Sequence, residues 1–362
     1  MPTNPFSPAF GSEPAYLAGR EAIVADFLEG LAGGVGDPNR STILIGPRGS
    51  GKTALINHIA TAASAQGWVS ARVTALPGML EAVIEQALEA GEHLLPAPAG
   101  AKLTGLGAFG VTVNMDRPEA RSASWRSQVA RIVDALGELG SGLLITVDEV
   151  DAKQAELVRL VADYQHFVSE GRAVALLMAG LPGKVLQMFT HRSISFVRRA
   201  FQHRLDPLSQ ADARLALRVP IESAGRSIEP KALDAAAAFS RGFPFLIQMV
   251  GYQTWRQHPG REVISAQDAA DGIRASQESM DAMILDTTVQ ELSKGDLEFL
   301  TAMKDDPDFS TIADLAARLR ISPSSAGQRR IRLIKAGVIE EYGRGQVRFT
   351  LPLLREYLQR AE

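Results

Sequence analysis

The sequence contains no cysteine, and this absence removes several kinds of site at once. Disulfide bonds, iron–sulfur clusters and thiolate zinc sites all require cysteine, so none of them can stabilise this chain. Long apolar runs are also missing, because the longest candidate, AVALLMAGLPG, is far shorter than the roughly 20 residues that span a bilayer. The first residues, MPTNPFSPAFGSEP, lack the basic and apolar regions of a secretory signal. We therefore expect a soluble, cytoplasmic protein.

A strong excess of charge of either sign is lacking as well. The chain has 38 Lys and Arg against 41 Asp and Glu, a formal net charge of −3. This balance gives no whole-chain bias toward nucleic acid or membranes, so any basic surface must be local. Hydrophobic residues make up 46% of the 362 residues, which is ordinary globular usage and enough for two or three domains.

Short apolar stretches alternate with helical stretches in the first half of the chain. STILIG (41–46), WVSARVTA (68–75), GLLITV (142–147) and AVALLMAG (173–180) have the pattern of strands, and amphipathic segments lie between them. This alternation predicts an α/β fold with a parallel sheet covered by helices on both faces. The glycine-rich piece 96–115 is expected to form a loop and a small hairpin.

The pattern changes after LDPLS (205–209). Four helical stretches follow with no convincing strand between them, at 210–224, 230–240, 244–257 and 266–285. From Ser293 the pattern becomes three helices and then a strand-like pair. We therefore predict three domains: an α/β domain at 1–207, an α-helical domain at 208–290 and a winged helix-turn-helix domain at 291–362.

A glycine-rich turn follows the first predicted strand. It fits the pattern G-x-x-x-x-G-K-[ST] and precedes a predicted helix, which is the context that this phosphate-binding motif requires. Glycines let successive backbone N–H groups face an anion, and the start of the helix adds partial positive charge. Lys52 is expected to reach the β- and γ-phosphates of ATP, and the Thr53 hydroxyl to bind Mg²⁺. The predicted nucleotide-binding residues of this turn are Gly46, Pro47, Arg48, Gly49, Ser50, Gly51, Lys52 and Thr53.

Two acidic residues, Asp148 and Glu149, end the apolar strand LLITV. A carboxylate at the end of a neighbouring strand can hold Mg²⁺, and a second one can orient and deprotonate the attacking water. We assign these roles to Asp148 and Glu149 respectively. The alternative is that the pair consists of solvated turn residues. No Asn-Lys-x-Asp motif favours guanine, so ATP is the expected nucleotide. A small-molecule kinase is a further alternative, but it has no evident use for the acidic pair or for the tail.

The order of phosphate loop, LLITVDE, third strand, four-helix segment and terminal winged helix resembles the AAA+ ATPases. The similarity is greatest to their initiator-like and STAND branches and to ATP-binding proteins of this layout in actinobacteria. YLAGREA (16–22) is similar to a signature that lies against the nucleotide base in those branches, which implicates Leu17, Ala18 and Gly19. RGFPFLIQMVG (241–251) resembles the Gly-x-Pro motif of STAND lids, which places Pro244 near the nucleotide. Its other explanation is a proline at the first position of a helix.

Two departures from the family pattern concern hydrolysis. The third strand ends in Ala179 and Gly180, where the family usually has a polar residue, and Arg241 is the one arginine near the expected place in the lid. These departures favour a slow nucleotide switch over a motor. Arg198 and Arg199 lie about where the resemblance implies an arginine finger. Their alternative role is a basic helix face.

The tail is locally basic within an acidic chain. Glu340 and Glu341 are the only acids from 321 to 348, against six cations that we predict to contact duplex DNA: Arg329, Arg330, Arg332, Lys335, Arg344 and Arg348. Two hypotheses follow. In the first, a slow ATPase associates with DNA through the winged helix. In the second, the winged helix packs on the ATPase, and the output of the switch is a protein partner or self-association.

Overall fold

The computed structural model describes residues 3–9, 11–92 and 124–360, so the hairpin expected at 96–115 lies outside the described residues. The chain forms two compact units. Residues 20–45 and 52–204 make up what we call the sheet unit, and residues 1–19, 46–51 and 205–362 make up the lid unit. Within the described ranges, no helix combines the length and the apolar character needed to cross a membrane.

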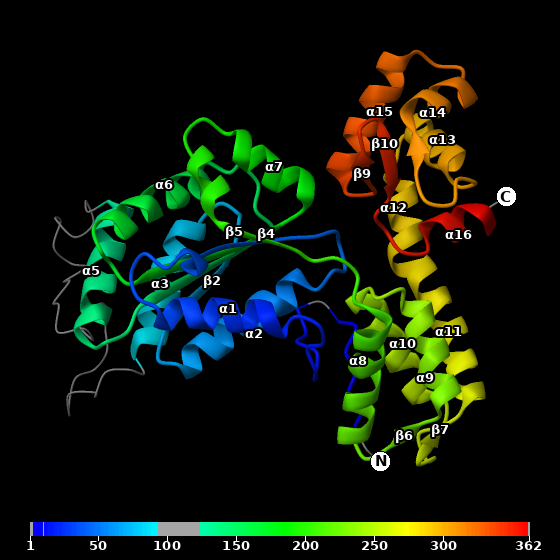
Figure 1. The fold of residues 1–362 in the computed structure, drawn as a ribbon, viewed down its shortest axis with the longest axis horizontal. Coiled ribbons are helices and arrows are strands. Elements are labelled where there is room, and N and C mark those ends of the chain that lie inside the picture. Colours follow the sequence, from blue (N-terminus) through cyan, green and yellow to red (C-terminus); the bar gives the residue numbers. More distant parts are fainter. Residues whose placement is uncertain (1–2, 10, 93–123, 361–362) are drawn as a thin grey trace. The chain divides into compact units, whose positions relative to one another are not determined.

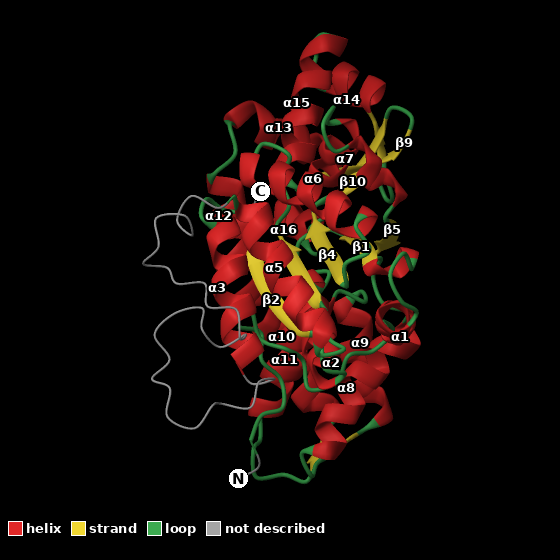
Figure 2. Ribbon diagram, turned by 90° about the vertical axis from the view of Figure 1, so that its left-hand side faces the viewer, coloured by secondary structure: helices red, strands yellow, loops and turns green. Residues whose placement is uncertain are grey.

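The sheet unit is built on a five-stranded sheet in the order β2-β3-β4-β1-β5, and its strands run parallel. This arrangement confirms the α/β fold predicted from the alternating pattern. Figure 2 shows the strands in yellow. The fifth strand was not anticipated, because it is a short edge strand whose Phe201 and Gln202 are exposed and therefore carry no buried pattern. The strands are β1 (Ser41–Ile45), β2 (Val69–Thr74), β3 (Leu143–Asp148), β4 (Val174–Gly180) and β5 (Phe201–Arg204).

Helices cover the sheet, with α6 and α7 on one side and α1 and α2 on the other (Figure 1). Every residue of β4 is buried, which is why this strand appears in the sequence as a continuous apolar run. The helices are α1 (Glu21–Ala32), α2 (Lys52–Ala65), α3 (Met79–Glu92), α5 (Trp125–Glu138), α6 (Ala155–Ser169) and α7 (Pro182–Thr190). Two 3₁₀ turns, η1 (Pro38–Arg40) and η3 (Ser195–Arg199), precede β1 and β5.

Four helices form the first part of the lid unit, close to the four predicted stretches. They are α8 (Gln210–Ser223), α9 (Pro230–Ser240), α10 (Pro244–Arg256) and α11 (Ala266–Met280). A π-helical turn, η4 (Asp281–Leu285), continues α11 into α12 (Asp286–Gln290). A two-residue parallel pair, β6 (Ser227–Ile228) and β7 (Val263–Ile264), links two loops. Pairs this short leave no periodic signal in a sequence.

The last part of the lid unit, residues 294–360, is called the tail subdomain here. It contains three helices and then an antiparallel strand pair, in the predicted order, and β8 completes a three-stranded sheet β8-β10-β9. Ser322 caps α15 by accepting a hydrogen bond from the Ser325 N–H at 3.1 Å, with Pro323 in the first helical position. The elements are α13 (Lys294–Met303), β8 (Ser310–Thr311), α14 (Ile312–Arg318), α15 (Pro323–Ala336), β9 (Ile339–Gly343), β10 (Gln346–Phe349) and α16 (Leu354–Arg360).

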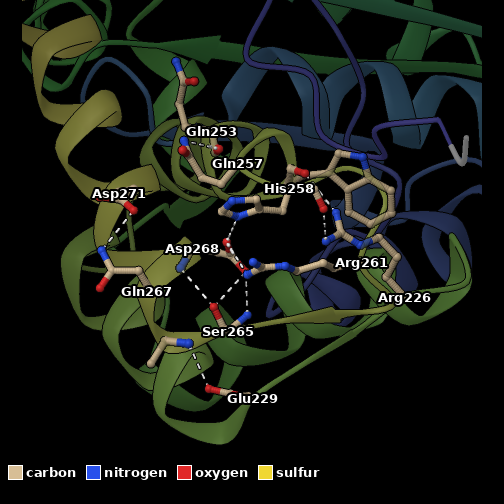
Figure 3. Close-up of polar contacts among 12 residues, drawn as sticks. Arg226, Glu229, Gln253, Gln257, His258, Arg261, Ser265, Gln267, Asp268 and Asp271 are labelled. Atoms are coloured by element: carbon tan, nitrogen blue, oxygen red, sulfur yellow. Dashed lines mark hydrogen bonds and ion pairs between the residues drawn. The ribbon is translucent and has the colours of Figure 1, made fainter.

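A buried carboxylate joins the end of α10 to the start of α11 (Figure 3). Asp268 is fully buried and accepts hydrogen bonds from the N–H and hydroxyl of Ser265, each at 2.8 Å, and a further one from His258. Arg226 holds the same corner by donating to the carbonyls of Trp255 at 2.9 Å and His258 at 3.0 Å. Burial alone would raise the pKa of Asp268, but the hydrogen bonds from Ser265 and His258 outweigh it and keep the pKa below its usual range.

This network makes the stability of the lid unit dependent on pH. Because the pKa of Asp268 is lower in the folded than in the unfolded state, its stabilisation is present at neutral pH and is lost as the pH falls through the folded-state value. We expect Asp268→Asn to lower the free energy of unfolding by about 2 kcal/mol at neutral pH. The difference from wild type should shrink toward acidic pH. Urea unfolding at several pH values measures it, with Asp271→Asn on the same helix as the control. A loss of equal size at every pH would exclude the charge as the cause.

Candidate nucleotide site

The predicted phosphate turn connects β1 to α2. Gly49 and Gly51 have φ angles of +77° and +84°, a region in which side chains other than that of glycine are strained. A Cβ atom at Gly46 would lie 2.5 Å from the hydroxyl oxygen of Ser50, and that hydroxyl donates to the Pro47 carbonyl at 2.8 Å. The glycines therefore stand where this compact turn needs them. Arg48 is exposed.

The start of α2 meets the end of β3. Lys52 and Thr53 are the first two residues of the helix, and the Thr53 hydroxyl donates to a carboxylate oxygen of Asp148 at 2.5 Å. The other Asp148 oxygen accepts the Glu149 N–H at 2.8 Å, which fixes the orientation of the carboxylate. The structure thus brings together the hydroxyl and the carboxylate that the sequence assigned to Mg²⁺. One hydroxyl and one carboxylate, completed by phosphate and water oxygens, are a suitable donor set for Mg²⁺.

Glu149 has an unusual backbone conformation. Its φ angle is +54°, in the left-handed region that disfavours residues other than glycine, and its side chain is exposed. The next residue is anchored, because the Val150 N–H donates to the Ala179 carbonyl at 3.0 Å. Backbone strain of this kind is concentrated at functional sites, where the surrounding structure maintains it. The conformation is consistent with a carboxylate that is presented to a ligand.

The end of β4 shows why no polar residue stands there. A Cβ atom at Gly180 would lie 2.5 Å from a methyl carbon of Val150 and 3.1 Å from one of Val185. The space that a polar side chain would need is therefore already filled by two valines. Nearby, Asp151 forms an ion pair with Lys184. Burial alone would raise the pKa of Asp151, but the hydrogen bond from Lys184 outweighs it, and the pKa is lowered.

The two candidate arginine-finger residues lie in η3. Both are exposed, and the Arg198 guanidinium donates to the Phe189 carbonyl at 2.6 Å. Arg199 lies on the wall of a cavity formed with α6 and the first residues of β1 and β4. A role in hydrolysis therefore remains a prediction for both.

The residues expected near the base and the lid motif lie in the lid unit. Leu17 is partly buried, and Ala18, 4% exposed, packs in an apolar cluster with α8. Gly19 has a φ angle of +66°, and a Cβ there would lie 3.0 Å from the Asp212 carboxylate. Pro244 begins α10, and a Cβ atom added at Gly51 would lie 3.5 Å from its side chain. The structure thus places the lid motif next to the phosphate turn.

Arg241 has a partner that the sequence did not reveal. It ends α9 in the left-handed conformation, with a φ angle of +50°, and its guanidinium binds Glu356 of α16 at 2.5 Å. Burial alone would raise the pKa of Glu356, but the hydrogen bond from Arg241 outweighs it and lowers the pKa. Two residues that are far apart in the sequence carry no local signal for such a pair.

Most of the six tail cations that were expected to contact DNA make contacts within the subdomain. Arg329 donates to the Gly295 carbonyl at 2.6 Å, and Arg332 binds both oxygens of Asp296 at 2.7 and 3.1 Å. Two further pairs are Arg330 with Glu341 at 3.6 Å and Arg348 with Glu340 at 2.6 Å. Lys335 and Arg344 are exposed, and neither forms a hydrogen bond or ion pair within the described part of the chain.

Comparison with known proteins agrees with this geometry. Residues 16–177 match the family described as AAA ATPase domain, and residues 282–358 match a domain of unknown function (DUF8462). No curated protein matches the sequence. Among solved structures, a Walker-type ATPase of Pyrococcus abyssi is 14% identical with a TM-score of 0.68, and 95% of this chain and 96% of that chain are covered.

Two other solved structures have the same architecture. The ORC2 protein of Aeropyrum pernix is 15% identical, with a TM-score of 0.60, and 98% of this chain and 97% of that chain are covered. The Cdc6p protein of Pyrobaculum aerophilum is 17% identical, with a TM-score of 0.51 and the same coverage. Residues 16–177 therefore match the AAA ATPase domain family, and the chain has the P-loop AAA+ fold.

The end of β4 gives a prediction about packing. Gly180→Ser should lower the free energy of unfolding by about 1–3 kcal/mol, because its side chain overpacks the space held by Val150. Adding Val150→Ala should recover part of this loss in the double variant. Urea unfolding measures both, and Gly137→Ser, where a Cβ meets nothing within 4 Å, is the control. Wild-type stability of Gly180→Ser would refute the steric explanation.

Proposed function

We propose that the protein binds Mg·ATP at residues 46–53 and hydrolyses it slowly, as a nucleotide-dependent switch. The observation that carries this proposal is the 2.5 Å contact between the Thr53 hydroxyl and the Asp148 carboxylate. Both oxygens would enter the coordination sphere of one Mg²⁺ ion. Thr53 and Asp148 would hold the ion, which would supply positive charge to neutralise the phosphates.

The other residues of the site complete the proposed binding of ATP. The turn 46–51 offers backbone N–H groups to the phosphates, since Gly49 and Gly51 allow the necessary backbone angles. Lys52, at the start of α2, adds a positive charge next to the helix dipole. Glu149 is the group that would orient and deprotonate the attacking water.

Two features support slow turnover. The packing of Val150 and Val185 around Gly180 leaves no polar side chain at the end of β4 to position water. The second feature is Arg241, the candidate lid arginine, whose guanidinium is already bound to Glu356. Because each missing contact raises the barrier, Glu149 carries most of the catalysis in this proposal.

The lid unit offers a route from the phosphate turn to the tail. The Phe245 N–H donates to the Gly49 carbonyl at 3.3 Å. Phe243 and Phe245 pack against an apolar cluster that includes Leu246 of the lid and Phe299 and Leu300 of α13. A change in the conformation of the turn would therefore reach the core of the tail subdomain through one short segment. This continuity supports the switch over an ATPase with an independent tail.

For the output, we propose that the tail subdomain is a winged helix that associates weakly with duplex DNA, within the three-domain division predicted from the sequence. Support comes from α15, which contacts α13, α14 and β9, and whose Ser324, Gln328 and Lys335 are exposed. Small hydroxyls and one amide read few base edges, so sequence preference should be low. Arg344 on the β9–β10 turn adds an exposed cation.

A protein partner is the second candidate output. It is favoured by the ion pairs of Arg330, Arg332 and Arg348, which reduce the positive charge offered to phosphates. Two large apolar side chains of the same subdomain are exposed: Ile331 is 61% exposed and Tyr342 is 52% exposed. Exposed side chains of this size are enriched in protein interfaces when they gather in a patch.

Two variants separate ATP binding from hydrolysis. Lys52→Ala should abolish Mg·ATP binding in calorimetry, whereas Lys153→Ala, which removes an exposed lysine, should retain it. Glu149→Gln should bind ATP but lose turnover by about 100-fold or more. Wild-type turnover should lie well below about 10 s⁻¹, the median for enzymes. Unchanged affinity in Lys52→Ala would refute the site, and turnover of tens per second would refute the switch.

The DNA hypothesis is best tested with Lys335 and Arg344. Arg329 and Arg332 are unsuitable, because their removal would disturb the contacts with α13. Lys335→Ala with Arg344→Ala should weaken duplex binding equally for all sequences and flatten the slope of log affinity against log salt by about 0.9 per lost contact. Fluorescence anisotropy of the full chain, with ATP and with ADP, measures this.

The control for this experiment is Lys294→Ala, which removes an exposed cation from α13 in the same subdomain. It should leave both the affinity and the salt slope unchanged. If the wild-type chain fails to bind DNA at low salt with either nucleotide, the protein-partner output is the better explanation.

A further inference from the structure

The sheet unit contains a cavity of about 490 Å³ that is separate from the candidate nucleotide site. It opens where β1 and β4 begin, at Ser41 and Val174, and is completed by η1, α6 and η3. Thr53 and Asp148 instead lie at the edge of the sheet where the strands end. Because the strands are parallel, these are opposite edges of one sheet. The proposed ATP-binding function does not use the cavity.

The inner part of the cavity is apolar. Its lining includes Leu176 and Met178 of β4, each 1% exposed, and Val161 of α6, which is fully buried. These side chains also belong to the main core cluster of the unit. A ligand that fills this space must therefore carry an apolar body, because a polyphosphate would lose its hydration here without compensation.

The wall of the cavity is cationic. Arg40, Arg172 and Arg199 line it, and Asp37 is the one carboxylate among the lining residues. Arg172 is paired with Asp134 at 2.7 Å, whereas within the described residues neither Arg40 nor Arg199 forms an ion pair. Asp37 accepts a hydrogen bond from the Asn39 N–H at 2.9 Å, which partly occupies its carboxylate. The wall therefore has positive charge to offer to an anion.

Arg40, whose guanidinium lies over the Trp68 ring at 5.0 Å from the centroid, has one nitrogen without a hydrogen-bond partner in the described part of the chain. Arg40 is 6% exposed, and its Nε and Nη2 donate to the carbonyls of Gly30 and Leu31 at 2.9 and 2.6 Å. The third nitrogen, Nη1, is buried and has no hydrogen-bond partner among the described residues. Buried donors are normally satisfied, so an unsatisfied one in a residue that lines a cavity points to an acceptor that the chain itself does not provide.

We propose that this cavity binds a small amphipathic anion, an organic carboxylate with an apolar body. The carboxylate is held by Arg199 at the mouth and by Arg40, and the apolar body lies against Leu176, Met178 and Val161. Tyr164 supports the wall, because its hydroxyl accepts from Ser41 at 2.8 Å and donates to the Arg40 carbonyl at 3.1 Å. This gives the sheet unit a second ligand site, of a chemical class different from nucleotides.

The test uses the full chain and decanoate as the probe, measured by calorimetry. Decanoate should bind with saturation, and decanol, which has the same chain without the charge, should bind at least about tenfold more weakly, the equivalent of one charged contact. Equal binding of the two would show that the cavity recognises only apolar surface, and no binding of decanoate would also overturn the proposal.

Variants locate the site. Arg199→Ala should weaken decanoate binding by about tenfold, whereas Arg192→Ala, an exposed arginine that does not line the cavity, should leave it unchanged. Ser169→Trp, at the rim on α6, should block decanoate binding while Mg·ATP binding persists. Binding should also persist in Lys52→Ala, which separates this proposal from the nucleotide site. Equal effects of the two arginine variants would refute the location, even if Ser169→Trp fails to fold.

Discussion

The contact between Thr53 and Asp148 depends on the parallel direction of the strands in the sheet unit. β1 and β3 are separated by β4 in the sheet, and all three end at the same edge. Groups that follow strand ends therefore gather at that edge, however far apart they lie in the sequence. The same constraint places the strand beginnings at the opposite edge, where the arginine-lined cavity opens. Each edge of the sheet thus carries a set of polar side chains next to the apolar core.

The sequence predicted the features that arise locally. Buried strands such as β4 leave continuous apolar runs, and Ser322 with Pro323 marks the start of α15. β5 was missed because an exposed edge strand has no apolar pattern. β6, β7 and β8 were missed because a strand of two residues is too short to show an alternation of apolar and polar residues. The turn at 46–53 was predictable because the backbone angles of Gly49 and Gly51 and the close packing at Gly46 require glycine within eight consecutive residues.

Long-range electrostatics could not be predicted in this way. A count of charges from 321 to 348 finds six cations and two acids, but Asp296 on α13 lies outside that window and binds Arg332. Burial alone would raise the pKa of Asp296, and hydrogen bonds from Arg332 and Ser293 outweigh it and lower the pKa. The pair therefore serves the fold of the tail subdomain. Charge along a sequence measures attraction to DNA only after such internal pairs are subtracted.

The junction of the lid with the tail combines a rigid backbone with a weak ion pair. A Cβ atom at Gly242 would lie 2.1 Å from the Leu208 carbonyl oxygen, so the backbone after Arg241 is fixed by close packing. In contrast, the side chains of Arg241 and Glu356 are 46% and 31% exposed, and pairs of this exposure contribute about 0–1 kcal/mol. The side chain of Arg241 is therefore held less firmly than the backbone that carries it.

The contrast between a weak Arg241–Glu356 ion pair and a closely packed backbone suits the proposed switch. Three further contacts of α16 with the lid are made by Tyr357 with Asp286 and by Arg360 with both oxygens of Asp281. These are side-chain contacts at the helix surface, whereas Leu354 and Leu358 of α16 are buried in the same apolar cluster as Phe243 and Phe245. The polar partners can therefore change while the helix keeps its apolar packing. A nucleotide shifts such an equilibrium only as far as it binds one arrangement better than the other. Because the ion pair is weak and the backbone is fixed, only a small difference in nucleotide affinity between the two arrangements is needed.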